Sequence, residues 1–263
     1  MNADIIALQE IESKEALEDL QKLTLYPYAV IADKKKSTVK NALLSKFKII
    51  ASDELFVDRF GYRNILEVKV DINGKPLTLF VNHWKSKGGA ESLRVLSAKV
   101  LKRRIDQLSD QDEFIILGDL NSNYNEHQTF IKKRKHNDTK GVTGINHILK
   151  TIKNDKLIQW SDLYEQKNNE YLYNLWLDFD KKSRWSHNFF GKKGSLDNII
   201  ITKALADNKD IEYIKKSFQR FAPKYLFYKR AINRWKISRK QPKHHTLHGY
   251  SDHLPLYADF IVK

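Results

Sequence analysis

Residues 113–122 read EFIILGDLNS, an apolar run that ends in a glycine and a polar turn. Residues 113–117 are short, continuous and rich in isoleucine, which is typical of a strand buried on both faces. Gly118 ends the run, and Asp119 and Asn121 follow it directly. Layered α/β folds carry functional side chains at such strand ends. The stretch therefore predicts a buried central strand with a polar site at its end.

The flanking sequence predicts further strands and helices. Residues 65–72 and 77–82 are predicted strands, and Asn73-Gly74 between them is a hairpin signal. Residues 91–108 form an amphipathic helix with leucine, valine and isoleucine on one face. Other strands are predicted at residues 4–8, 28–32, 42–50, 195–202 and 254–262, and a helix at residues 13–23. This alternation favours a sheet-rich α/β layered domain. No linker or repeat divides residues 1–263, so we expect one domain.

The composition excludes several classes of protein. The chain has 263 residues, of which 41% are hydrophobic and none is cysteine. It is too apolar for a disordered chain. It has no disulfide framework, no thiolate metal site and no cysteine nucleophile. No apolar run reaches the ~20 residues that a membrane span needs. The N-terminus reads MNADIIALQE and shows no signal peptide.

The positive charge lies in two blocks. The formal net charge is +15, and residues 213–243 and 131–140 carry this excess. A solvated surface usually mixes the two signs along the chain, so two basic blocks on a neutral body favour contact with a polyanion. Aromatic residues are interleaved with the larger block, where they either stack on bases or form the buried face of an element. A generally lysine-rich surface is the alternative explanation.

Polar residues gather at five predicted strand ends, in LQE (8–10), NHWKSK (82–87), GDLNS (118–122), SLDNI (195–199) and YSDHLPL (250–256). Each segment alone has an ordinary structural explanation, such as a turn or a satisfied histidine. Together they supply carboxylates, amides and two histidines. Carboxylate and carbonyl oxygens without cysteine suit Mg²⁺, Mn²⁺ or Ca²⁺. Histidines beside such an ion bind phosphate oxygens and move protons.

The order of these five segments resembles the endonuclease/exonuclease/phosphatase superfamily, which has the DNase I-like fold. NHWKSKGG followed by ESLRVLSAKVL resembles its bacterial nuclease branch. The resemblance runs from about Asn2 to Phe260 and is weakest between Glu126 and Trp185. It implies a four-layer α-β-β-α sandwich of two mixed sheets, with the site at one edge.

The resemblance also implies roles for the residues that carry it. Glu10 resembles the metal-ligand glutamate, and Asp252 a second acid of the metal site, for Mg²⁺ or alternatively Mn²⁺ or Ca²⁺. Asp119 and Asn121 resemble the pair that orients the attacking water and contacts the phosphate.

The two histidines resemble the catalytic histidines of the superfamily. His83 is expected to donate to a phosphoryl oxygen or the leaving group. His253 is the second, and Asp197 resembles the acid that holds it in its working tautomer. Arg63 resembles the arginine of an arginine–acid pair beside the site. The residues expected to contact substrate are Arg63, Lys85, Lys87, Lys229, Arg230, Arg234, Lys236 and Arg239.

The sequence departs from the family pattern at two points. The family opens with a strand whose asparagine completes the metal site, whereas Met1 stands nine residues before Glu10. We therefore expect an N-terminally shortened sequence. In the DNase I branch an acid follows the arginine and supports the first histidine, and here that position is Asn64. Glu67 is the nearest substitute, provided that strand alternation places it on the right face.

The leading functional hypothesis is a metal-dependent endonuclease that hydrolyses phosphodiester bonds of DNA, with RNA as an alternative substrate. A second hypothesis is a phosphomonoesterase, such as a phosphoinositide phosphatase, because one fold hosts several substrates. A third is an inactive domain that binds nucleic acid. We expect a monomer without a membrane span. It would be secreted or periplasmic if a signal peptide precedes the given start, and cytoplasmic otherwise.

Overall fold

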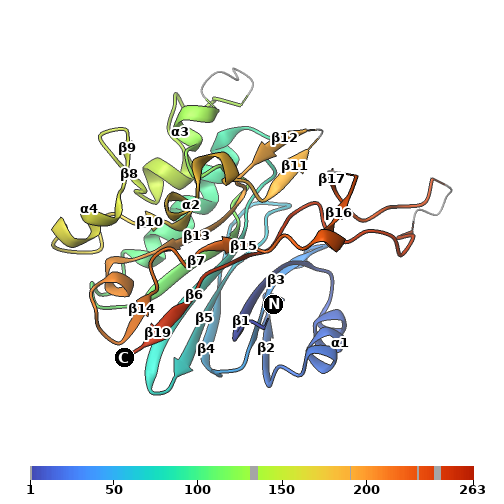
Figure 1. The fold of residues 1–263 in the computed structure, drawn as a ribbon, viewed down its shortest axis with the longest axis horizontal. Helices are drawn as coiled ribbons and strands as arrows, with labels where there is room; N and C mark the ends of the chain where they lie inside the picture. The colour runs from blue at the N-terminus through green and yellow to red at the C-terminus, as the bar shows by residue number, and fades with distance from the viewer. Residues whose placement is uncertain (1, 131–135, 190, 230, 240–243) are drawn as a thin grey trace.

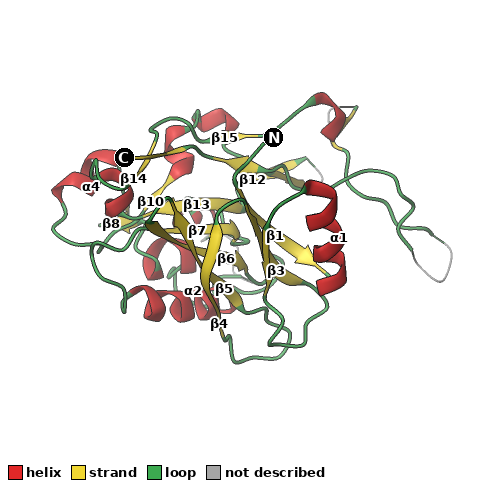
Figure 2. Cartoon of the chain, turned by 90° about the horizontal axis from the view of Figure 1, so that it is seen from below, coloured by secondary structure: helices red, strands yellow, loops and turns green. Residues whose placement is uncertain are grey.

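The computed structural model describes residues 2–130, 136–189, 191–229, 231–239 and 244–263 (Figures 1 and 2). Its larger sheet has six strands in the order β10-β13-β7-β6-β5-β4. Their bounds are β4 Lys48–Leu55, β5 Ile65–Ile72, β6 Lys75–His83, β7 Phe114–Asp119, β10 Tyr173–Asn174 and β13 Asp197–Ile201. The β6–β7 pair is parallel and the other pairs are antiparallel, so this sheet is mixed. The helix α2 (Glu91–Ile105) makes the crossover between β6 and β7.

A smaller sheet packs against the larger one. Its strands follow the order β1-β3-β2 and pair antiparallel, with bounds β1 Ile5–Ile11, β2 Tyr28–Ile31 and β3 Lys40–Ser45. Two antiparallel pairs, β14–β19 and β15–β18, come from the C-terminal part of the chain. Their bounds are β14 Ile211–Tyr213, β15 Gln219–Arg220, β18 Leu256–Tyr257 and β19 Phe260–Val262.

The remaining elements are short, apart from α1. They are α1 Lys14–Thr24, α3 Glu126–Thr129, α4 Trp160–Glu165, β8 Ile152–Lys153, β9 Lys156–Leu157, β11 His187–Phe189, β12 Lys192–Gly194, β16 Phe227–Tyr228 and β17 Ala231–Ile232, with a π-helical turn η1 at Gly144–Ile148. Single turns of 3₁₀ helix lie at Leu175–Asp178, Lys181–Ser183, Lys203–Ala206 and Lys224–Leu226. Among the residues described, no helix combines the length and apolar character of a membrane span.

Side-chain alternation builds three apolar layers. In β3, Leu43 faces the larger sheet, whereas its neighbours Ala42 and Leu44 face α1. In the larger sheet, Leu79 points to the sheet–sheet interface and Phe80 to α2. Successive residues of a strand point to opposite faces, so each sheet is apolar on both sides. Figure 2 shows α1 and α2 on opposite outer sides of the strands. The α-β-β-α sandwich implied by the resemblance is confirmed, although only the larger sheet is mixed, because the described strands of the smaller sheet all pair antiparallel.

Two predicted strands are each divided in the structure. The predicted strand at residues 42–50 belongs to two strands, because the chain turns at Lys46 and Phe47 between β3 and β4. The Ser45 hydroxyl accepts a hydrogen bond from the Phe47 N–H at 2.9 Å and stabilises that turn. The predicted strand at residues 254–262 is likewise split into β18 and β19. A continuous apolar pattern did not reveal either break.

Residues 221–229, 231–239 and 244–250 project from the body of the sandwich (Figure 1). Within this segment, which we call the arm, β16 pairs with β17, and the N–H of Lys236 donates to the carbonyl of His248 at 3.0 Å. The N–H of Tyr250 donates to the carbonyl of Asn233 at 2.7 Å where the arm returns to the body. Five basic residues of the larger block are described on this projecting hairpin-like structure, namely Lys224, Lys229, Arg234, Lys236 and Arg239.

Candidate active site

Strand register places three predicted site residues side by side. His83 ends β6 and is paired with Asp119 at the end of β7, and Asp119 is paired with Asp197 at the start of β13. Residues paired across neighbouring strands point to the same face of a sheet. One imidazole and two carboxylates therefore form a row across three adjacent strands.

Gly118 allows β7 to end in this position. Its φ is +116°, and a Cβ atom there would lie 2.2 Å from the carbonyl oxygen of Asn82 on β6. The following turn locks Asp119, whose Oδ1 accepts from the N–H of Asn121 at 2.8 Å and whose Oδ2 accepts from its side-chain amide at 2.9 Å. The same amide donates to the carbonyl of Trp84 at 3.1 Å. The Asp119–Asn121 pair is thus rigid and buried.

A second pair joins Asp197 to His253. His253 Nδ1 lies 2.7 Å from Asp197 Oδ2, which also accepts from the Ser186 hydroxyl at 2.5 Å. Burial alone would lower the pKa of His253. The field and hydrogen bond of Asp197, helped by Asp119 and Asp252, outweigh burial and raise that pKa to about 10. His253 is therefore a cation at neutral pH and aims Nε2 away from Asp197.

Glu10 reaches the row from the other sheet. It lies in a bulge of β1, between Leu8 and Ile11, with a φ of +63°. Its Oε1 is 3.9 Å from His83 Nε2, and Asp119 Oδ2 is 3.5 Å from the same nitrogen. A non-glycine residue with positive φ is strained, and such strain is common at functional sites.

Burial is the largest influence on the pKa values of His83 and Asp119. Burial, then the positive charges of Arg63 and His253, lower the pKa of His83 to about 3, so its imidazole is neutral. Burial and then the charge of Asp197 raise the pKa of Asp119 above its usual range. Arg63 is partly buried and interacts electrostatically with Glu10 and Asp119.

The carboxylates suit a hard cation. Glu10 Oε1 and Asp119 Oδ2 lie 3.9 and 3.5 Å from His83 Nε2, so carboxylates from the two sheets approach the same point. Oxygen donors of this kind fit Mg²⁺, Mn²⁺ or Ca²⁺. Asp252, the other predicted ligand, lies beside His187, with 3.9 Å between its Oδ2 and His187 Nε2.

Asn64 and Glu67, the two candidates for the support of His83, both have other partners. Asn64 donates its amide to Glu54 at 2.8 Å, and Glu67 forms a bidentate pair with Arg104 of α2 at 2.8 Å for both contacts. Strand alternation has turned Glu67 to the helix side of the sheet. His83 Nδ1 is buried and has no hydrogen-bond partner among the described residues.

The predicted substrate-binding lysines have different environments. The Lys85 ammonium lies 5.1 Å from the ring centre of Tyr62. Lys87 forms an ion pair with Glu126, whose carboxylate is fully buried, so this lysine has a structural partner. The arm residues Lys229, Arg234, Lys236 and Arg239 are exposed. Arg230, like residues 131–135 of the smaller basic block, lies outside the described residues.

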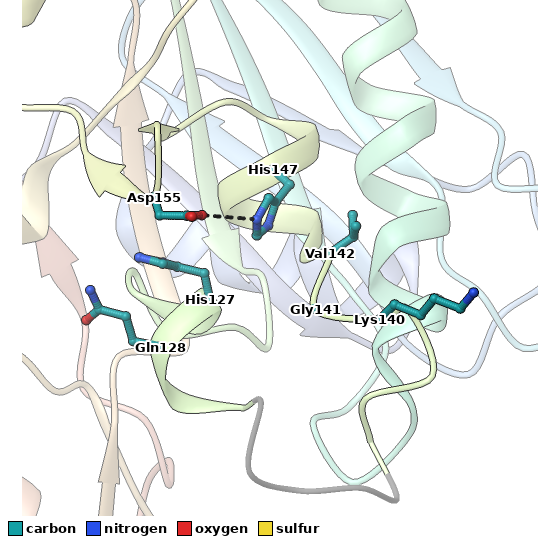
Figure 3. Close-up of a pocket in the computed structure, with 7 residues that line it drawn as sticks. All are labelled: His127, Gln128, Lys140, Gly141, Val142, His147 and Asp155. Atoms are coloured by element: carbon teal, nitrogen blue, oxygen red, sulfur yellow. Dashed lines mark ion pairs between the residues drawn. The ribbon is translucent and has the colours of Figure 1, made fainter.

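Sequence reasoning missed His187 and Ser186. Ser186 precedes the β11–β12 hairpin and His187 is its first residue, so neither follows a strong strand and no strand-end signal marks them. A separate cavity of about 630 Å³ was also missed, lined by His127, Gln128, Lys140, Gly141, Val142, His147 and Asp155 (Figure 3). None of these seven residues belongs to the strand-end row.

Comparisons with known proteins agree with the fold described above. The model of the Endonuclease/Exonuclease/phosphatase family matches residues 1–157 and 153–262. No curated protein matches the sequence significantly. The fold is similar to D. rerio TDP2 complexed with single strand DNA product, with 14% identity over 99% of this chain and 86% of that one and a TM-score of 0.60.

Two other structures share the fold. The human Nocturnin catalytic domain with bound sulfate has 15% identity over 99% of this chain and 81% of that one, with a TM-score of 0.62. The Bacteroides thetaiotaomicron mannosyl-6-phosphatase has 13% identity over 98% and 85%, with a TM-score of 0.58. Identities this low establish the fold alone, whereas the family model covers nearly the whole chain. The chain therefore belongs to the endonuclease/exonuclease/phosphatase family, whose members are hydrolases that generally use divalent metals.

Proposed function

We propose that the protein is a divalent-metal-dependent nuclease that hydrolyses phosphodiester bonds of DNA. The observation that carries the proposal is the pairing of a cationic His253, held by Asp197 at 2.7 Å, with the rigid Asp119–Asn121 pair on the neighbouring strand. A proton donor and a carboxylate therefore lie side by side, which is the arrangement that acid–base hydrolysis of a phosphate ester uses.

The residues divide the work of the reaction. Asp119 accepts a proton from the attacking water, and the Asn121 turn fixes the direction of its carboxylate. His253 donates to the leaving oxygen, because Asp197 keeps it protonated. The neutral His83 donates one hydrogen bond to a phosphoryl oxygen.

Glu10 and Asp119 would hold the cation, which would neutralise charge on the phosphate oxygens. Arg63 adds a fixed positive charge at the same edge.

The arm supports a nucleic-acid substrate. Its exposed cations include Lys229 and Lys236, both 5.6 Å from the ring centre of Tyr228, and Arg234, 5.6 Å from the ring centre of Trp235. The arm returns to the body immediately before Asp252 and His253. A DNA backbone that binds these cations would therefore lie near the catalytic residues, as binding of a polyanionic substrate requires.

The first test is cleavage of supercoiled plasmid DNA with Mg²⁺ or Mn²⁺. His253→Ala should lower the rate by about 10²–10³-fold or more, because it removes the proton donor. His147→Gln, in the separate cavity, is the matched control and should retain activity. Hydrolysis of sugar phosphates or inositol phosphates without nicking of DNA would instead support a phosphomonoesterase. Metal-independent DNA binding without either reaction would support a non-catalytic domain.

The role of the arm is tested by salt dependence. Neutralising Lys229, Arg234, Lys236 and Arg239 together should weaken DNA binding and flatten the plot of log K against log salt by about 0.9 for each DNA phosphate that the variant no longer neutralises. Fluorescence anisotropy in EDTA measures this without cleavage. An unchanged slope would exclude a DNA-facing role for the arm.

A further inference from the structure

The β11–β12 hairpin brings a third histidine against the catalytic pair. His187 and His253 form an antiparallel backbone bridge, and their ring centres are 4.5 Å apart at an interplanar angle of 44°. The N–H of Leu254 donates to the carbonyl of Ser186 at 2.8 Å and holds the two segments together. The juxtaposition of the imidazoles is therefore fixed by the backbone on both sides.

A carboxylate completes the group. One ring nitrogen of His187, one carboxylate oxygen of Asp252 and one ring nitrogen of His253 all lie within 4.8 Å of one another. Asp252 Oδ2 is 3.9 Å from His187 Nε2. All three side chains are partly exposed, so an ion from solvent can reach them.

His253 is oriented as a metal ligand would be. Asp197 engages Nδ1 at 2.7 Å, which leaves Nε2 as the nitrogen available to an ion. In metal sites, a ligating histidine almost always donates its other ring N–H to a carboxylate or carbonyl, and this fixes the ring. The Ser186 hydroxyl, at 2.5 Å from Asp197 Oδ2, anchors that carboxylate in turn.

The donor atoms of His187, Asp252 and His253 favour a different ion from the one that the carboxylates of Glu10 and Asp119 favour. Two imidazoles and one carboxylate with an open fourth position are typical of Zn²⁺ sites. Glu10 and Asp119 offer oxygen alone, which suits Mg²⁺ or Mn²⁺. The same edge of the sandwich therefore carries two donor sets of different chemical preference.

We propose that His187, Asp252 and His253 form a Zn²⁺ site through which zinc inhibits the enzyme. Zinc binds at His253 Nε2 once this nitrogen has released its proton to solvent. The ion then replaces the proton that His253 donates, so it blocks the reaction instead of assisting it. The inhibitory consequence rests on the nuclease function proposed above, whereas the binding site itself does not.

A second cluster of possible metal ligands shares His253 with the proposed zinc site, so His187 is the residue whose substitution distinguishes the two. Asp119, Asp197 and His253 also have donor atoms within 4.8 Å of one another, and within this group His253 Nδ1 is hydrogen-bonded to Asp197. Of these two groups of described residues, the proposed zinc site is the one that uses His187. His187→Gln removes the ligand while leaving the Asp197–His253 pair and the oxygen donors intact.

Zinc binding is measured by calorimetry on the metal-free full chain, titrated with ZnSO₄. The wild type should bind one ion, and His187→Gln should weaken its affinity by roughly tenfold or more. His147→Gln is the matched control, because His147 is also a partly buried histidine near an aspartate, with Nε2 4.0 Å from Asp155 Oδ1. Visible absorption of bound Co²⁺ gives a second readout, since a four-coordinate nitrogen–oxygen site yields an intense band. Circular dichroism and thermal melting confirm that each variant is folded.

Cleavage of plasmid DNA at fixed Mg²⁺ then tests inhibition. Zinc should inhibit the wild type, and His187→Gln should raise the inhibitory zinc concentration by the same factor as the loss in affinity. Equal zinc affinity in the wild type and His187→Gln, or no zinc binding by the wild type, would overturn the site. Zinc binding that depends on His187 in a protein that cuts no DNA would retain the site and refute the nuclease function instead.

Discussion

Replacing Asp197 by asparagine tests whether this carboxylate sets the charge of His253. Asp197 Oδ2 accepts from His253 Nδ1 at 2.7 Å and from the Ser186 hydroxyl at 2.5 Å. Asparagine has the same shape but no charge, whereas the burial of His253 is unchanged. Burial lowers the pKa of His253, while Asp119 and Asp252 still raise it, so the pKa in Asp197→Asn should fall from about 10 toward the ordinary value of 6.5.

The magnitude follows from that shift. A change from 6.5 to about 10 is equivalent to at most about 5 kcal/mol. Because 25% of the His253 side chain is exposed, solvent screening reduces this value. The pKa is raised in the folded state, so the stabilisation is fully present below pH 6.5 and is lost as the pH rises to about 10. The stability difference between wild type and variant should shrink over this range.

NMR titration of the imidazole resonances in metal-free protein measures the pKa directly. Asp155→Asn is the control, because Asp155 is 88% exposed and 4.0 Å from His147, and the pKa of His147 should change little. The cleavage rate of Asp197→Asn should fall about 10³–10⁴-fold, as expected when an aspartate that orients a catalytic histidine is neutralised. A His253 pKa that stays near 10 in the variant would refute the reasoning.

Three other substitutions test the surroundings of the site by urea denaturation. Gly118→Ala should destabilise the protein by about 2–3 kcal/mol and abolish cleavage, because its Cβ would lie 2.2 Å from the carbonyl oxygen of Asn82. Lys87→Gln should cost about 3 kcal/mol, because the buried Glu126 carboxylate loses its counter-ion. Burial raises the pKa of Glu113 from 4.5 to about 7, so Glu113→Gln should be neutral below pH 4.5 and stabilising by up to about 3 kcal/mol above pH 7.

For each of these three predictions, one result would contradict the reasoning. Gly88→Ala is the control for Gly118→Ala, since the nearest atom to its Cβ is the Ser86 hydroxyl at 3.7 Å, and equal effects would exclude a special role for Gly118. An unchanged unfolding free energy in Lys87→Gln would mean that the lysine acts only on substrate. A stability gain in Glu113→Gln that is independent of pH would exclude ionisation of Glu113 as its cause.

The pattern of strands and helices predicted a sheet-rich α/β layered domain, because side-chain alternation determines which residues are buried between layers. The four-layer sandwich was implied by the resemblance of the five strand-end segments to the superfamily. The sequence also predicted most of the row at the strand ends, since β6 and β7 end where their apolar runs end. It did not predict the turn at Lys46 and Phe47, where a serine hydroxyl interrupts an apolar pattern. It missed His187, whose contact with His253 depends on docking of a hairpin distant in sequence. Such contacts leave no local periodicity.

The register of β6, β7 and β13 has a consequence for quality control of the protein. His83, Asp119 and Asp197 share one face only because their strands are paired at one particular offset. A slip of one residue in β7 would turn Asp119 toward α2 and bring Gly118 or Leu120 into its place. Catalytic activity therefore depends on correct strand pairing, and the specific activity of a preparation measures the fraction of molecules that have the correct strand register.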